Sequence, residues 1–521
     1  MAIGEAKPLM VQGTHSDSGK SILVTALCRI FAEDGQAVAP FKSQNMALNS
    51  YITNDGHEIG RAQGIQAEAA GVAASVHMNP ILIKPSGDMK SQIVLHGKPY
   101  LDMQASAYRQ DFYETGLRAI RDSYAILADA YDTIVIEGAG SPAEINLNDR
   151  ELVNMRVARL VDAPVILVGD IDRGGVFASL VGTLQLLPKE DRARVKGVVI
   201  NKFRGDIALL QSGLDWFEEY TGVPVLGVIP FIPDLEIDGE DSLILDQYKS
   251  GGTNDDANLD IAVIAHPTFS NFTDIDPLRL ESDCNIRFVK KAAQLGTPDI
   301  IILPGTKNTA YAMQFIKDTG LEKEIARLAA EGTYVFGICG GFQMLGEEIR
   351  DPKQVESEVA RMEGLKLLPV ATEMQADKKT IVSAGFTGCA GIKKRALKGY
   401  EVHMGQTAAH KQVAPFAILN GEAEGCCKDE GKIIGTYLHN VFHNDGFRGD
   451  YLNMVRLSKG LPALERTLHM AELKEREYKR LAEHVRKHVD MNKIYSIMNK
   501  QKGDCDHERK NTKHCKHYTT C

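Results

Sequence analysis

The chain has 521 residues, of which 44% are hydrophobic, and its formal net charge is -9 at pH 7. This length exceeds what one compact core supports, so two or three domains are expected. The sequence contains no basic tract interleaved with aromatic residues, so a nucleic-acid partner is not expected. No apolar run approaches the roughly 18 residues that span a bilayer. The N-terminus, MAIGEAKPLMVQG, lacks the pattern of a secretory signal. The scattered cysteines suggest no disulfide framework, which favours a reducing cytoplasm.

The first half of the chain alternates apolar strand-like runs with helical patterns, as parallel α/β folds do. The run AKPLMVQG predicts a strand, and GKSILVTALCRIFAEDG predicts a helix that closes at Gly35. Three further apolar runs, YDTIVIEGAGS, APVILVGDID and VKGVVINKFRGD, end in polar residues. Ligands of doubly wound sheets bind beyond the carboxyl ends of the strands. Residues 1–238 are therefore predicted to form a parallel-sheet domain with a site at these ends.

The second half begins a new alternation after a polar, glycine-rich stretch at residues 239–257, which is interpreted as a linker. The runs LDIAVIAHP, PDIIILPGTKNT and TYVFGICGG predict a second α/β domain over residues 258–460. Residues 461–500 form a helical segment with an apolar stripe, which is expected to pack on the second domain. This stripe consists of Tyr478, Leu481, Val485 and Val489. Residues 501–521 are expected to be a disordered tail.

The stretch MVQGTHSDSGKS resembles a phosphate-binding loop with one residue more than the usual spacing. A strand precedes it and a helix follows it, as backbone cradling of phosphate requires. Lys20 is expected to hold the β- and γ-phosphates, and Ser21 to place its hydroxyl on Mg²⁺. The alternative is an ordinary polar loop, which the flanking elements disfavour. The predicted ATP-binding residues are Gly13, Thr14, Gly19, Lys20, Ser21, Asn201 and Lys202.

Other strand ends extend this prediction. Glu137 closes an apolar strand, where its carboxylate could hold Mg²⁺ directly or through water. Asn201 and Lys202 follow GVVI, where related folds read a purine base. Lys42 follows a short apolar strand and suits an anionic ligand, although an ordinary surface lysine fits the pattern equally well.

The stretch TYVFGICGGFQMLG predicts a nucleophile elbow around Cys339. The glycines on both sides suit the strained backbone of such a turn, and a following helix N-terminus favours the thiolate. The N–H of Gly340 is a candidate oxyanion donor, and Gly305 lies at a neighbouring strand end that could supply another. A buried structural cysteine is the less favoured alternative.

A thiolate nucleophile needs a base. His439 follows an unbroken apolar run in GTYLHNVF and is preferred to His403 and His443. The separation from Cys339 in the sequence is no obstacle, because such partners meet in space.

Together, these stretches closely resemble the cobyric acid synthases, a family of glutamine-dependent amidotransferases of cobalamin biosynthesis. The matching segments run from residue 10 to about residue 442. The segments QNMALNS and DIDRGGVFAS are specific to that family. The resemblance implies a P-loop-type domain like that of dethiobiotin synthetase, followed by a class I glutaminase domain with a flavodoxin-like fold.

The resemblance also implies an activity. Cys339 would release ammonia from glutamine, with His439 as its base. MgATP would phosphorylate the b, d, e and g carboxylates of adenosylcobyrinic acid a,c-diamide in turn, and ammonia would convert each acyl phosphate to an amide. The anionic substrate requires a local basic site. Candidates for this basic site are Lys42, Lys84, Arg156 and Arg173, and Asp149 could position the ammonia or the acyl phosphate.

One departure from class I glutaminases is that His439 is followed by Asn440 and Val441, with no acid at the usual position. The third member of the triad is therefore unassigned, and Glu401 is one candidate. The alternatives in function are a cobyrinic acid a,c-diamide synthase and a regulatory P-loop ATPase with an inactive glutaminase domain. The cysteine- and histidine-rich tail fits no structural zinc pattern well. The oligomeric state is left open, with a homo-oligomer as one option.

Overall fold

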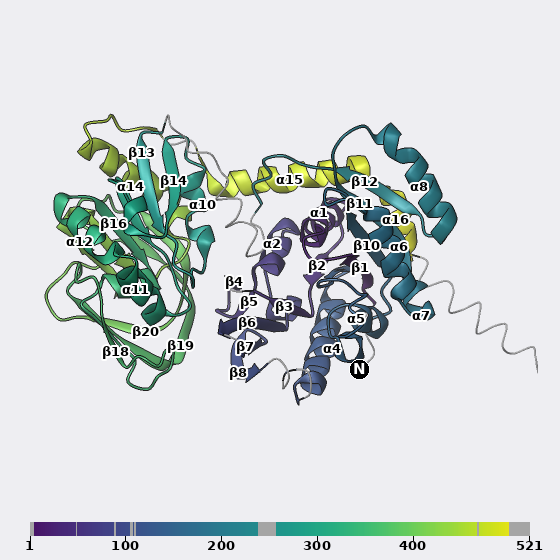
Figure 1. Ribbon diagram of the computed structural model, residues 1–521, viewed down its shortest axis with the longest axis horizontal. Coiled ribbons are helices and arrows are strands. Elements are labelled where there is room, and N and C mark those ends of the chain that lie inside the picture. Colours follow the sequence, from purple (N-terminus) through teal and green to yellow (C-terminus); the bar gives the residue numbers. More distant parts are fainter. Residues whose placement is uncertain are drawn as a thin grey trace, which may run out of the picture. The chain divides into compact units, whose positions relative to one another are not determined.

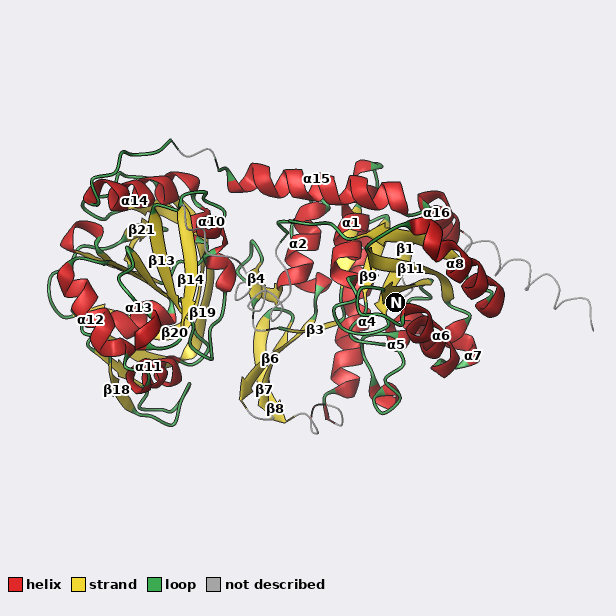
Figure 2. Cartoon of the chain, turned by 45° about the horizontal axis from the view of Figure 1, so that its top comes forward, coloured by secondary structure: helices red, strands yellow, loops and turns green. Residues whose placement is uncertain are grey.

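The structure is a computed structural model, and it contains two compact units (Figures 1 and 2). It describes residues 5–47, 49–87, 90–104, 108, 111–237, 257–465 and 468–499. Unit 1 contains the described residues within Met1–Ala47, Ile59–Ile237 and Lys474–Cys521. Unit 2 contains those within Leu48–Glu58 and Asp238–Leu473. The chain therefore passes from one unit to the other four times instead of once.

The core of unit 1 is a parallel sheet of six strands in the order β12-β11-β10-β1-β9-β2. These strands are β1 (Lys7–Gly13), β2 (Val38–Phe41), β9 (Thr133–Glu137), β10 (Val165–Asp170), β11 (Val195–Phe203) and β12 (Val225–Pro230). Their apolar β-branched residues are buried on both faces, as a parallel sheet covered by helices requires. All six strands share one direction, so their carboxyl ends meet at one edge.

Helices cover the two faces of this sheet. One face packs against α1 (Lys20–Glu33) and the other against α4 (Tyr113–Ala130), α6 (Val176–Leu186) and α8 (Ile207–Thr221). Further described helices of unit 1 include α2 (Arg61–Ala69), α5 (Met155–Leu160) and α7 (Lys189–Arg192), with 3₁₀ turns η1 (Val76–Met78) and η2 (Asn148–Arg150). A small sheet has the order β3 (Gln44–Met46), β6 (Ile81–Gly87), β7 (Lys90–Leu95) and β8 (Lys98–Gln104).

The two last described helices are α15 (Met470–His488) and α16 (Met491–Asn499). Leu481, Val485 and Val489 share a buried cluster with Leu9 and other residues of β1, α1 and β11. The prediction that this stripe packs on the second domain is therefore wrong, since it covers the α1 face of unit 1. An amphipathic stripe fixes which side chains are buried but not which partner buries them.

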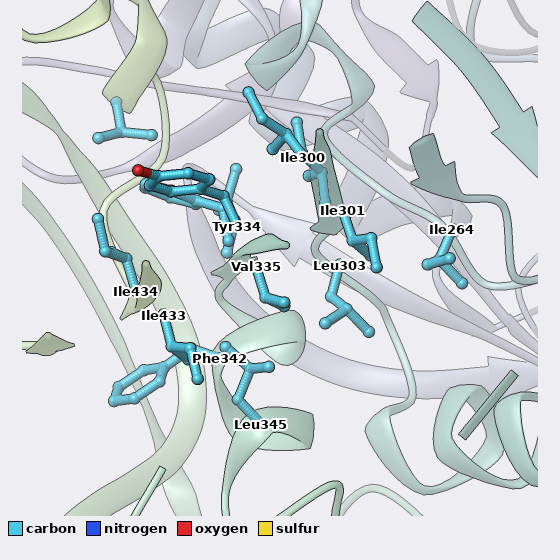
Figure 3. Packing of buried hydrophobic residues seen from close by; sticks show 14 of the residues in the cluster. Ile264, Ile300, Ile301, Leu303, Tyr334, Val335, Phe342, Leu345, Ile433 and Ile434 are labelled. Atoms are coloured by element: carbon cyan, nitrogen blue, oxygen red, sulfur yellow. The ribbon is translucent and has the colours of Figure 1, made fainter. Parts of the chain in front are cut away.

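Unit 2 also has a central sheet, in the order β14-β13-β15-β16-β24-β23, with only the β23–β24 pair antiparallel. The strands are β13 (Leu259–Ile264), β14 (Cys284–Val289), β15 (Ile300–Leu303), β16 (Tyr334–Ile338), β23 (Cys426–Lys428) and β24 (Ile433–Thr436). Figure 3 shows the apolar side chains of β15, β16 and β24 packed with Phe342 and Leu345 of the helix that follows β16.

The helices of unit 2 are α10 (Asp276–Arg279), α11 (Thr309–Asp318), α12 (Leu321–Glu331), α13 (Gly340–Leu345) and α14 (Asp445–Ser458). Its 3₁₀ turns are η3 (Phe272–Asp274), η4 (Ala292–Gln294), η5 (Asp429–Gly431) and η6 (Val441–His443). A second sheet contains β17 (Glu348–Arg350), β18 (Arg361–Glu363), β19 (Val370–Thr387), β20 (Ala396–Ala409), β21 (Ala417–Leu419) and β22 (Glu422–Glu424). A two-stranded sheet pairs β4 (Ser50–Ile52) with β5 (Glu58–Gly60).

Three sequence predictions concern other parts of the chain. Residues 239–256 of the predicted linker and the whole tail at 501–521 lie outside the described residues. Cys389 and Cys427 are joined in a disulfide, with Cα atoms 5.7 Å apart, so the expectation of no disulfide is wrong for this pair. Among the described helices, none combines the length and apolarity that a bilayer crossing needs.

Candidate active sites in the two units

The loop from Gly13 to Ser21 in unit 1, called here the phosphate loop, connects β1 to α1. Gly19 has a left-handed backbone, with φ 95°. A Cβ atom at Gly13 would lie 2.1 Å from the Ser18 hydroxyl, and one at Gly19 would lie 2.0 Å from the Asn201 amide nitrogen. Glycine at both positions therefore lets the loop backbone pack closely against Ser18 and Asn201.

Polar groups of the phosphate loop are available for a ligand. The hydroxyls of Thr14 and Ser18 are buried without a hydrogen-bond partner, which is unusual unless a ligand or water completes the site. The Lys20 ammonium donates to the carbonyls of His15 at 3.0 Å and Gly140 at 3.4 Å. These contacts hold Lys20 beside the loop, where it can meet a phosphate.

Glu137 is the centre of a buried polar cluster at the end of β9. Its Oε1 accepts hydrogen bonds from the Ser21 hydroxyl and the Lys42 ammonium, both at 2.8 Å, and its Oε2 accepts one from Gln66 at 2.6 Å. Burial raises the pKa of Glu137, but Lys42 and the hydrogen bonds outweigh it and hold the pKa below its ordinary value. The cluster thus holds an ionised carboxylate beside the helix that receives the phosphate loop.

Asn201 and Lys202 lie on the other side of the phosphate loop. The Asn201 amide donates to a loop carbonyl at 3.0 Å, and Lys202 donates to the Asp17 carbonyl at 2.7 Å. Lys202 also pairs with Asp170 at 2.7 Å, and Arg173 approaches the Asp17 carboxylate at 3.4 Å. Both predicted purine-reading residues therefore brace the loop, and their contact with a base remains a prediction.

The other predicted substrate residues are placed differently. Lys42 and Arg173 lie in the clusters just described. Asp149 is exposed on η2, and its carbonyl accepts a hydrogen bond from Arg156 at 3.4 Å. Lys84 is buried on β6. The roles of these residues toward a substrate remain predictions.

The turn around Cys339 in unit 2 has the geometry of a nucleophile elbow. Cys339 follows β16, begins α13 and has the rare angles φ 54° and ψ -110°. A Cβ atom on Gly341 would lie 1.9 Å from the Leu303 carbonyl oxygen, so the turn requires small residues. The strained backbone presents the thiol at the helix start, where the N–H of Gly340 can face an oxyanion.

His439 lies beside this turn, three residues after the end of β24 at Thr436. Its side chain is buried and stacks on Tyr400, with ring centroids 5.1 Å apart. Its main-chain N–H donates to the Tyr400 carbonyl at 2.8 Å. A Cβ atom on Gly305 would lie 3.2 Å from the His439 ring, so the predicted Gly305 also borders the site.

Asp274, at the end of η3, is the acid that orients His439. Its Oδ2 lies 2.7 Å from His439 Nδ1, and its Oδ1 accepts a hydrogen bond from the Asn440 N–H at 2.6 Å. Burial lowers the pKa of His439, but the Asp274 carboxylate and a hydrogen bond with Cys339 outweigh it and raise the pKa to about 10. The site therefore favours an imidazolium beside the cysteine.

Glu401, the acid suggested by the sequence, serves elsewhere. It lies on β20 and accepts hydrogen bonds from Lys379 at 2.7 Å and Ser383 at 2.6 Å. His403 lies 3.5 Å from Glu401 and is held by the Gly405 carbonyl at 2.7 Å. The Glu401 suggestion is thus wrong. The carboxylate that contacts His439 belongs to Asp274, which precedes Cys339 in the sequence, whereas Glu401 follows it. The polar segment SNFTD was the available signal for Asp274.

The comparisons with known proteins agree with this arrangement. Residues 9–244 match the family model described as CobQ/CobB/MinD/ParA nucleotide binding domain, and residues 260–447 match the CobB/CobQ-like glutamine amidotransferase domain. A cobyric acid synthase of Geobacillus sp. (strain WCH70) is 57% identical over 497 residues, which covers 95% of this chain and 98% of the relative. The chain belongs to the cobyric acid synthase family.

A more distant cobyric acid synthase, from Streptococcus sanguinis (strain SK36), is 51% identical over 504 residues, with 95% of this chain and 99% of the relative covered. Membership of the cobyric acid synthase family confirms the predicted fold class, a nucleotide-binding parallel-sheet domain joined to a glutamine amidotransferase domain.

Proposed function

We propose that this chain amidates the b, d, e and g carboxylates of adenosylcobyrinic acid a,c-diamide, with glutamine as the nitrogen source and ATP as the activating substrate. The observation that carries the proposal is the complete Cys339–His439–Asp274 array in the same chain as the phosphate loop and Glu137. Family membership at this level of identity supports the substrate assignment.

The array in unit 2 suits glutamine hydrolysis. Cys339 Sγ attacks the carboxamide carbon, and the Gly340 N–H stabilises the oxyanion that forms. Asp274 holds Nδ1 of His439, which leaves Nε2 to give its proton to the departing ammonia. Water then attacks the thioester, His439 accepts the proton from that water, and glutamate is released.

The cluster in unit 1 suits phosphoryl transfer. Lys20 and the loop N–H groups would hold the phosphates of ATP. A carboxylate of the substrate attacks the γ-phosphorus, ADP leaves, and ammonia then displaces phosphate from the acyl phosphate to give the amide. Lys42 and Arg173 are the proposed residues for the corrin carboxylates, and Asp149 is proposed to position the ammonia or the acyl phosphate.

Mg²⁺ fits the same cluster. The Ser21 hydroxyl and the Glu137 carboxylate are hard oxygen donors that already lie together, as this ion prefers. When bound, Mg²⁺ would neutralise the charge that develops on the phosphates.

Two experiments separate this proposal from its alternatives. With the a,c-diamide, glutamine and MgATP, mass spectrometry should detect stepwise replacement of acid by amide, with ADP and phosphate as co-products. Amidation of only the unmodified hexa-acid would favour a cobyrinic acid a,c-diamide synthase. Cys339→Ala should abolish synthesis from glutamine but not from ammonium salts. The control is Cys284→Ala, which changes another buried cysteine and should keep both activities. A wild-type chain without glutaminase activity would favour a regulatory ATPase.

A further inference from the structure

Segment 49–58 follows β3 in the chain, yet its contacts place it in unit 2. It forms a hairpin in which the Thr53 N–H donates to the His57 carbonyl at 2.8 Å. Glu58 pairs with Lys378 of β19 at 2.7 Å, with both side chains largely buried. At the turn, a Cβ atom on Gly56 would lie 3.2 Å from the Thr380 carbonyl. The hairpin is therefore fixed against β19.

Asn49 is the first described residue of this hairpin, and it is buried. Its side-chain Oδ1 accepts a hydrogen bond from the main-chain N–H of Asn271 at 2.7 Å. Asn271 has a left-handed backbone, with φ 55° and ψ 44°, and it immediately precedes η3. Such a conformation costs free energy in a residue with a side chain, so it needs support from its surroundings. The Asn49 hydrogen bond supplies part of that support.

Asn271 and η3 together orient His439. The Asn271 amide nitrogen lies 3.2 Å from both ring nitrogens of His439. The Asn271 carbonyl accepts a hydrogen bond from the Asp274 N–H at 3.0 Å, and the Asp274 carboxylate holds His439 Nδ1. The Asp274 carboxylate that holds His439 Nδ1 therefore depends on the turn that Asn49 fixes, as does the Asn271 side chain that contacts the ring.

We propose that Asn49 is a positioning residue for the catalytic histidine, acting through Asn271 and Asp274 on the orientation of His439. This inference rests on the proposed glutaminase activity. It assigns a role in glutamine hydrolysis to a residue that lies in the nucleotide-binding half of the sequence. The motif QNMALNS, which contains Asn49, then has a role at the ammonia-producing site.

The test compares three variants of the full chain. Asn49→Ala removes the acceptor, and we expect at least a tenfold fall in glutaminase kcat with little change in KM for glutamine, because His439 is misaligned but glutamine still binds. Asn49→Asp keeps the acceptor oxygen and should stay within about threefold of the wild type. Asn54→Ala, an exposed position of the same hairpin, should match the wild type.

A second measurement distinguishes positioning from general damage. The rate at which iodoacetamide alkylates Cys339, followed by mass spectrometry across pH, reports without turnover how His439 acts on the sulfur. In Asn49→Ala the alkylation rate below neutral pH should fall, whereas synthesis from ammonium salts should be retained.

The inference is overturned if Asn49→Ala keeps the wild-type kcat and alkylation profile, or if it loses ammonia-dependent synthesis to the same extent. Failure of Asn49→Asp to restore activity would also overturn it, because the acceptor would then not be the group that matters. A wild-type chain without glutaminase activity would instead contradict the proposed function.

Discussion

Asp274 raises the pKa of His439, the proposed catalytic base, so its removal should change how activity depends on pH. In Asp274→Asn, burial still lowers the pKa of His439, but the carboxylate that raises it is gone. The imidazolium should then lose its proton at a lower pH, and the alkaline limb of the glutaminase pH profile should move to lower pH. We also expect kcat/KM to fall by on the order of a hundredfold or more.

The control for this experiment is Glu401→Gln. Glu401 is bound to Lys379 and Ser383, so this variant should keep the alkaline limb in place. Equal displacement of the limb in both variants would contradict the assignment of Asp274 as the orienting acid.

Lys20 should be needed with either nitrogen source, because both routes require the same acyl phosphate. Lys20→Ala removes a positive charge from the phosphate loop, and turnover should fall on the order of a hundredfold or more with glutamine or ammonium. Lys196→Ala, on an exposed position of β11, is the matched control. If Lys20→Ala retains near-normal synthesis from ammonium, ATP binds elsewhere.

The residues that could be predicted from the sequence are those at the ends of regular strands. Cys339 and Glu137 each follow an apolar run, so periodicity placed them near a sheet edge. Asp274, Asn271 and Asn49 lie in irregular turns, where no periodic pattern indicates which side chains meet. Their role depends on a tertiary arrangement that brings residues far apart in sequence to one imidazole.

At the scale of whole elements, α15 should contribute to the stability of unit 1. Leu481 is buried against the α1 face of the sheet, and Leu481→Ala should lower the free energy of unfolding by about 2–5 kcal/mol. Lys479→Ala changes a side chain that is 64% exposed, and its effect should stay within about 0.5 kcal/mol. Denaturant titration followed by the fluorescence of Trp216, which lies in unit 1, measures both.

An unchanged midpoint in Leu481→Ala would contradict the packing of α15 on unit 1. The existence of this helix was predictable, because its apolar stripe repeats at helical spacing. The unit on which the helix packs was not predictable, because both units offer apolar surfaces. Unit 2 directly precedes the helix in the sequence, yet the helix packs on unit 1.

At the scale of the molecule, the two halves of the sequence should not separate when the chain is cut. An engineered protease site between Gly251 and Gly252 would leave α15 and α16 on the C-terminal fragment, although both helices complete unit 1. After cleavage, we expect the fragments to co-elute in size-exclusion chromatography without denaturant and to separate in denaturant.

The same cut in a chain that ends at Leu473 provides the control, since that chain lacks most of α15 and all of α16. Only segment 49–58, which belongs to unit 2, would still join its fragments, so we expect them to co-elute less completely. Separation of the fragments of the full chain under native conditions would contradict the division of the sequence between the units. A linear division into consecutive domains follows from motif order, but it cannot reveal segments that return to an earlier domain.

Because α15 and α16 belong to unit 1 but stand at the end of the described chain, unit 1 cannot be completed until nearly the whole protein has been synthesised. A ribosome releases the strands of the first sheet early, whereas the helices that cover Leu9, Leu27 and Leu226 emerge only after residues 238–473 have been made. At about 5–20 residues per second, that interval lasts roughly 10–50 s. During this time the part of the apolar face that α15 and α16 later bury stays exposed to water, so we expect unfinished chains to aggregate more readily than finished ones.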